Sequence, residues 1–111
     1  MSANIEVKYV ENIYLTDIKQ RFKLLKFNEY KLKMRGHKMT DEKINECNEN
    51  IKYYKNQIED EIDEFEDDLY KMEILRCGEG DNLIENDPDI DFQKFKLKIK
   101  EFEKMNYFDF A

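Results

Sequence analysis

The densest chemistry in this 111-residue chain is a run of carboxylates between residues 59 and 68. Eight of these ten positions are acidic, and only Ile62 and Phe65 interrupt them. Carboxylates can serve as general acids or bases, as metal ligands, or as a negatively charged binding surface. We expect this run to bind a partner by charge alone, through Glu59, Asp60, Glu61, Asp63, Glu64, Glu66, Asp67 and Asp68.

Few other residues could support catalysis or hold a metal ion. His37 is the only histidine, and Cys47 and Cys77 are remote from it in sequence, so one chain supplies no zinc ligand set. The segment 87–98 begins like a calcium-binding loop but lacks the Gly at its sixth position and the Glu at its twelfth. Ser2 is the only serine, and no glycine-rich phosphate loop occurs. The sequence therefore predicts a non-enzymatic protein with no metal and no cofactor.

The overall composition predicts one soluble domain over residues 1–111. The chain has 26 acidic and 19 basic residues, which give a formal net charge of −7, and 14% of its residues are aromatic. No apolar run approaches the ~20 residues of a membrane span. The first residues lack the basic and then apolar pattern of a signal peptide, so we expect a cytoplasmic protein.

The elements that position the acidic run are predicted to be helices. Residues 41–76 place ten apolar side chains at steps of three or four, with Thr40 as the N-cap. The spacing of Tyr54, Ile58 and Ile62 is a stutter in this pattern, so the sequence leaves open one long helix or two.

Two shorter segments are expected to pack against this central helix. Residues 16–35 fit a helix capped by Thr16, whereas residues 4–10 alternate like a short strand. Residues 88–105 fit a third helix, although 94–100 also alternate as a strand would. The predicted fold is mainly α, with a long central helix flanked by two shorter antiparallel helices. The alternative is an α+β fold in which strands 4–10 and 94–100 pair.

The charge is unevenly distributed along the chain. Residues 1–40 carry a net charge of +5, whereas residues 41–80 carry −9. One interpretation is that the lysines of 16–35 and 94–100 line the edges of the acidic helix and neutralise it. The more specific interpretation is that the carboxylates in excess of the lysines point outward and attract a basic, nucleic-acid-handling partner protein. We therefore predict a small inhibitor or adaptor. If its carboxylates occupy the phosphate-binding groove of the partner, the protein would be a nucleic-acid mimic.

Two alternative functions follow from other residues. A structural component could self-associate as a homo-oligomer through apolar surface at Tyr53, Tyr70 and the aromatic end 107–110. The basic amphipathic segment 19–38 could instead bind nucleic acid, although the net charge of −7 argues against that as the main role. The abundance of Lys, Asn, Ile and Glu is typical of AT-rich genomes, which include those of many phages and mobile elements. We find no resemblance to a known family in these patterns.

Overall fold

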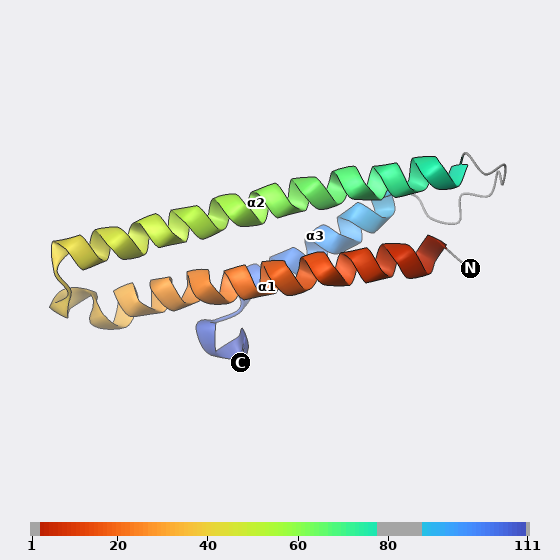
Figure 1. The fold of residues 1–111 in the computed structure, drawn as a ribbon. Helices are drawn as coiled ribbons and strands as arrows, with labels where there is room; N and C mark the ends of the chain where they lie inside the picture. Colours follow the sequence, from red (N-terminus) through yellow and green to blue (C-terminus); the bar gives the residue numbers. More distant parts are fainter. Residues whose placement is uncertain (1–2, 78–87, 111) are drawn as a thin grey trace.

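The computed structural model describes residues 3–77 and 88–110, including the side chains of residues 7–72 and 88–110. It contains the helices α1 (Ala3–Arg35), α2 (Asp41–Cys77) and α3 (Pro88–Lys104), and the 3-10 turns η1 (Gly36–Lys38) and η2 (Tyr107–Phe110). Figure 1 shows α1 and α2 side by side in opposite directions, with α3 lying across one half of the pair. The molecule is elongated, with extents of 63 × 22 × 18 Å. The predicted mainly α fold is confirmed.

The central helix α2 is continuous over 37 residues, which answers the question that the stutter left open. Thr40 caps it as predicted, because the amide of Lys43 donates to Thr40 Oγ1 at 3.3 Å. Asp41 and Glu42 occupy the first turn, where the helix dipole favours negative charge. None of the helices in the described ranges is long and apolar enough to cross a membrane.

The N-terminal strand predicted over residues 4–10 is wrong, because α1 begins at Ala3 and runs for 33 residues. Val7 is 4% exposed and continues the helical spacing of Tyr14, Ile18 and Phe22, so the three- and four-residue period extends through the whole segment. Thr16 lies exposed within the helix and is not its cap. Helix α1 is therefore nearly as long as α2, rather than one of two shorter helices that flank it.

The third segment is helical, and the alternative strand over 94–100 is wrong. Helix α3 starts at Pro88 as predicted and buries Phe92, Phe95 and Ile99 at steps of three and four. The alternating lysines that suggested a strand lie instead around the other faces of this helix, and Lys96 sits 5.0 Å over the Phe92 ring. Residues 79–87, whose polar composition predicts a loop with Asp87 as the N-cap of the next helix, lie outside the described residues.

The core lies where all three helices meet. Phe65 and Leu69 of α2, Ile18 of α1 and Phe95 of α3 are fully buried. The Phe65 and Phe95 ring centroids are 4.2 Å apart, and Tyr14 adds a ring 5.3 Å from Phe65. Burying each large apolar side chain contributes about 1.5–3 kcal/mol, so this aromatic centre holds the three helices together.

The aromatic C-terminal segment packs on the protein itself. Phe110 is 6% exposed and joins the core, with its ring centroid 6.3 Å from that of Phe102. The turn η2 is closed at its start by Asp109, whose Oδ2 accepts from the Asn106 amide at 2.8 Å. Figure 1 shows this turn beside α1, beyond the end of α3.

Candidate partner-binding surface

The eight predicted binding residues occupy the middle of α2, and the helix divides them between two environments. Because the run covers nearly three turns, its side chains point around the whole circumference. Three of them are half-buried, namely Glu61, Glu66 and Asp68. The other five are exposed, namely Glu59, Asp60, Asp63, Glu64 and Asp67. The prediction of one outward-facing set therefore needs correction for the three half-buried acids.

Glu61 faces α1 and pairs with a cation there. Its Oε1 lies 3.1 Å from Arg21 Nε, and Arg21 also donates from Nη1 to Gln57 on α2. The Glu61 side chain is only 14% exposed, and its Oε2 has no hydrogen-bond partner among the described residues. Burial raises the pKa of Glu61 above its ordinary value, and Arg21 offsets part of that rise. This carboxylate is committed to the interface between helices.

Asp68 is also bound to α1, through a tyrosine. Tyr14 Oη donates to Asp68 Oδ2 at 2.5 Å. Burial, followed by the hydrogen bond to Asp68, raises the pKa of Tyr14, so the phenol stays protonated and keeps donating. Together with the Arg21–Glu61 pair, this bond fixes the register of α1 on α2.

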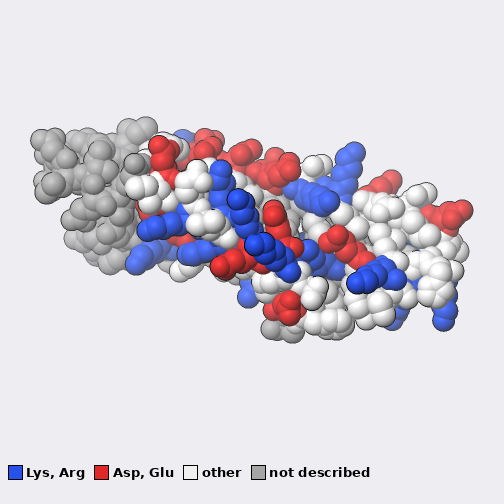
Figure 2. All heavy atoms as spheres, turned by 180° about the vertical axis from the view of Figure 1, so that it is seen from behind, with Lys and Arg blue, Asp and Glu red and all other residues white. Residues whose placement is uncertain are grey.

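The outermost acids form a continuous line, which we call the acidic stripe: Asp60, Asp63, Glu64 and Asp67. Steps of three and four residues place them on one face of α2, opposite the buried Phe65. Among the described residues, none of the four forms an ion pair with a Lys or Arg. Figure 2 shows acidic atoms gathered along this upper edge of the molecule, while basic atoms lie mostly below them. The predicted lack of local neutralisation therefore holds for these four.

Glu59 belongs to a different feature from the stripe. It lines a groove of about 340 Å³ between α1 and α2, together with Lys26, Lys55 and the apolar Phe22 and Ile58. Its surroundings therefore include the side chains of two lysines. Glu66 is half-buried on the same side of α2 as Glu59.

The described residues offer this surface charge but little chemistry. No group of three His, Cys, Asp or Glu within the described ranges could hold a metal ion. Cys47 is a free thiol, but it is 3% exposed on the inner side of α2 and so is shielded from substrates. The arrangement is suited to binding a cationic surface by electrostatics.

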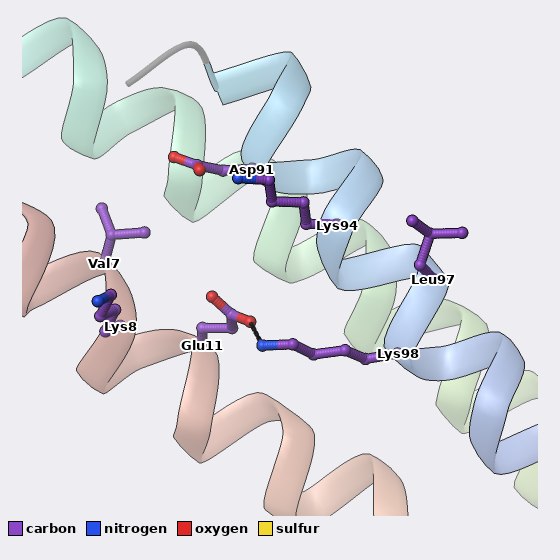
Figure 3. A pocket seen from close by; sticks show the side chains of 7 residues that line it. All are labelled: Val7, Lys8, Glu11, Asp91, Lys94, Leu97 and Lys98. Carbon is purple, nitrogen blue, oxygen red and sulfur yellow. Dashed lines mark hydrogen bonds and ion pairs between the residues drawn. The ribbon is translucent and has the colours of Figure 1, made fainter. Parts of the chain in front are cut away.

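A second polar surface was not predicted, because it depends on how α1 and α3 meet. A cleft of about 510 Å³ opens between them, with Val7 at its floor and Lys8, Lys94 and Leu97 in its walls. Figure 3 shows the Lys98 amine of α3 reaching Glu11 of α1, and the two atoms are 2.7 Å apart. This ion pair joins the two helices, and both of its residues line the cleft.

The residues predicted for self-association fall in three separate places. Tyr53 is 55% exposed, and its hydroxyl accepts from Gln57 Nε2 at 2.5 Å. Tyr70 is 37% exposed and donates to Asp89 at the start of α3. The segment 107–110 lies on α1 instead. These side chains therefore do not form one continuous apolar face.

In comparisons with known proteins, no family model, no curated protein and no solved structure matches this chain.

Proposed function

We propose that this chain is a non-enzymatic, cytoplasmic interaction protein that binds a basic surface of another protein through the acidic stripe. The observation that carries the proposal is the set of four carboxylates on one face of a continuous helix, with no cation of the described chain paired to them. The arrangement costs stability, because like charges at i,i+3 and i,i+4 repel, and binding a basic partner would offset that cost.

The support beneath the stripe suits a binding role. Phe65 and Leu69 are fully buried on the opposite side of the same turns of α2, so the backbone that carries the carboxylates is held by the core. Asp60 and Asp67 are seven residues apart, which corresponds to about 10 Å along the helix axis. A rigid row of this length matches a small cationic groove of the kind that holds phosphates. The favoured role is an inhibitor or adaptor that occupies such a groove in a nucleic-acid-handling protein.

The test compares two variants that lose the same number of charges. The stripe variant is D60N/D63N/E64Q/D67N, and the control is E42Q/E49Q/E101Q/E103Q, whose four acids are also exposed. Each is used to capture proteins from the source cells at about 0.1 M and about 0.5 M salt. At the higher concentration the electrostatic screening length falls well below 10 Å. We expect basic proteins to be captured by the wild type and the control at low salt only, and to be lost with the stripe variant.

Two further results would sharpen or end this proposal. If a captured protein normally binds nucleic acid, added DNA or RNA should compete for the same site. The amount of chain released should then rise with the fraction of the partner that is bound to nucleic acid. If the stripe variant captures the same proteins as the control at both salt concentrations, the stripe is not the binding surface.

A further inference from the structure

A cluster of aromatic rings covers the junction between the last third of α1 and the turn η2. The ring of Tyr107 lies 5.1 Å from that of Phe27 and 5.9 Å from that of Tyr30, centroid to centroid. Phe108 completes the set at 5.2 Å from Tyr30. We call Phe27, Tyr30, Tyr107 and Phe108 the aromatic cluster. Each ring contacts another, so the cluster is a preformed platform.

Much of this platform is exposed. Phe108 is 65% exposed and Phe27 is 36% exposed, while Met34 beside them is 53% exposed. An open hollow of about 410 Å³ lies between α1 and η2, and Tyr30, Tyr107 and Phe108 form part of its wall. Exposed apolar groups that gather in this way mark interaction sites more often than scattered single residues do.

A row of lysines leads along α1 to this hollow. Lys19, Lys23, Lys26 and Lys33 are spaced by steps of three, four or seven residues, so they follow one side of the helix over about 21 Å. We call these four the lysine row. Lys26 is held by Glu29 at 3.9 Å and by the Glu103 carbonyl at 2.7 Å. Among the described residues, the other three lysines have no ion-pair partner.

We infer that the lysine row and the aromatic cluster together bind single-stranded nucleic acid. The row supplies cations for successive phosphates, and the cluster supplies ring faces on which unpaired bases stack. The hollow of about 410 Å³ has room for a base, and its lining includes Lys33 together with Lys26 and Glu29, which pair with each other. Lys33 therefore supplies the cation for a phosphate at this hollow. A duplex fits less well, because its base faces are already stacked on one another and closed to the cluster.

Other occupants fit the same surface less well. A second copy joined by a two-fold axis would set one lysine row against another, which is unfavourable. An acidic protein segment would satisfy the lysines but offers no set of flat rings to match the cluster. Nucleic acid supplies both regularly spaced negative charges and ring faces.

The net charge of −7 does not oppose this inference, because the charge is segregated. Residues 19–38 include eight Lys or Arg and a single acid, Glu29. The acidic stripe lies on the outer face of α2, whereas the lysine row runs along the side of α1 nearer α3 and η2, since Lys26 reaches Glu103 there. The inference therefore does not depend on the function proposed for the stripe.

The experiment measures fluorescence anisotropy of labelled single-stranded DNA and RNA of about 15 nucleotides, titrated with the full chain at low salt. Phe108→Ala removes the most exposed ring of the cluster, and we expect it to weaken binding about tenfold, in line with the loss of one stacked base. Tyr9→Ala is the matched control, since Tyr9 is 67% exposed on α1 but lies far from the cluster in sequence. It should leave the affinity unchanged.

A second variant tests the lysines through the salt dependence. In K19Q/K23Q/K33Q the slope of log affinity against log salt should become shallower by about two, because each phosphate contact to a single strand contributes about 0.7. The control K43Q/K52Q/K71Q removes three exposed lysines of α2 and should keep the wild-type slope. Circular dichroism of each variant confirms that the helices are intact.

Three results would overturn the inference. The first is no rise in anisotropy at low salt with protein at about 100 μM, well above the range of specific binding. The second is equal weakening by Phe108→Ala and Tyr9→Ala. The third is displacement of the oligonucleotide by a poly-glutamate peptide at a matched charge concentration, which would assign the surface to acidic protein segments.

Discussion

The α1–α2 pair is built differently at its two ends, and the difference explains where a binding surface can be held rigid. In the half covered by α3, Ile18, Phe65, Leu69 and Phe95 are fully buried. At the other end, over residues 28–35 and 41–52, only Asn28 and Cys47 are buried. Figure 1 shows that α3 ends before it reaches this part of the pair. We call the first region the three-helix half and the second the two-helix end.

The acidic stripe lies on the three-helix half, directly behind the best-packed residues of α2. Repulsion within the stripe amounts to a few tenths of a kcal/mol for each like-charge pair, whereas one buried aromatic side chain contributes several times more. The core can therefore hold four unpaired carboxylates in place. The same stripe at the two-helix end would have much less packing to oppose its repulsion. The charged surface therefore depends on the packing beneath it.

Removing the centre of the three-helix half should have the largest effect. Phe65→Ala deletes a ring that is 0% exposed and contacts Phe95 and Tyr14. We expect a loss of about 3–5 kcal/mol in the free energy of unfolding, the usual result for a large buried aromatic. Urea denaturation followed by circular dichroism measures it. Tyr53→Ala, at a 55% exposed aromatic on the same helix, should cost less than about 1 kcal/mol.

The two-helix end should be less sensitive to a comparable change. Asn28 is 5% exposed, donates to the Leu24 carbonyl at 2.8 Å and accepts from Asn50 Nδ2 at 3.3 Å. Asn28→Ala should cost about 1 kcal/mol, the net value of such hydrogen bonds. The same denaturation assay measures it beside Phe65→Ala. If the two substitutions were equally costly, the proposed difference between the two ends would not exist.

The helices were largely predictable because apolar spacing is a local signal. The steps of three and four along 41–76, and the start of α3 at Pro88, were enough to place two of the three helices. The start of α1 could not be predicted in the same way, because Ile5, Val7 and Tyr9 alternate with polar residues as the residues of a short strand do. The helical period becomes visible only when Val7 is read together with Tyr14 and Ile18, which are both in contact with the core.

The division of the acidic run was less predictable, because it depends on contacts between helices. Glu61 turns inward to meet Arg21, and Asp68 meets Tyr14. Tyr14 precedes the predicted helix 16–35, so its pairing with Asp68 depends on the N-terminal extension of α1. The sequence identified the charge, but the register of α1 on α2 decides which acids remain outside.

Neutralising the stripe should stabilise the protein slightly. A loss of partner binding in this variant could then not be explained by a loss of folded protein. The stripe variant D60N/D63N/E64Q/D67N removes eight like-charge pairs at i,i+3 or i,i+4, four within the stripe and four with neighbouring acids of α2, so we expect a gain of about 1 kcal/mol at low salt. Screening should reduce the gain at about 0.5 M salt. The control E42Q/E49Q/E101Q/E103Q removes only two such pairs, Glu42–Glu46 and Glu46–Glu49, and should change stability less. A stripe variant less stable than the wild type would mean that these carboxylates make stabilising contacts within the fold.

The smallest effect concerns Glu61, the acid at the interface of the two helices. Because its pKa is raised in the folded state, the stability it contributes is fully present when the pH is below its unfolded pKa and is lost as the pH rises through its folded pKa. Glu61→Gln cannot ionise, so the variant should gain stability relative to the wild type as the pH increases from about 4 to about 7. Urea denaturation at several pH values measures this difference.

The contribution of Arg21 to the pKa of Glu61 can be tested by replacing this arginine. Arg21 lowers the pKa of Glu61 and offsets part of the effect of burial, so in an Arg21→Gln background the raised pKa should rise further. The gain from Glu61→Gln between acidic and neutral pH should then be larger than in the wild-type background. A gain of the same size in both backgrounds would show that Arg21 does not stabilise the Glu61 carboxylate. In that case the pair would serve to align α1 on α2, as buried ion pairs do when they add specificity without stability.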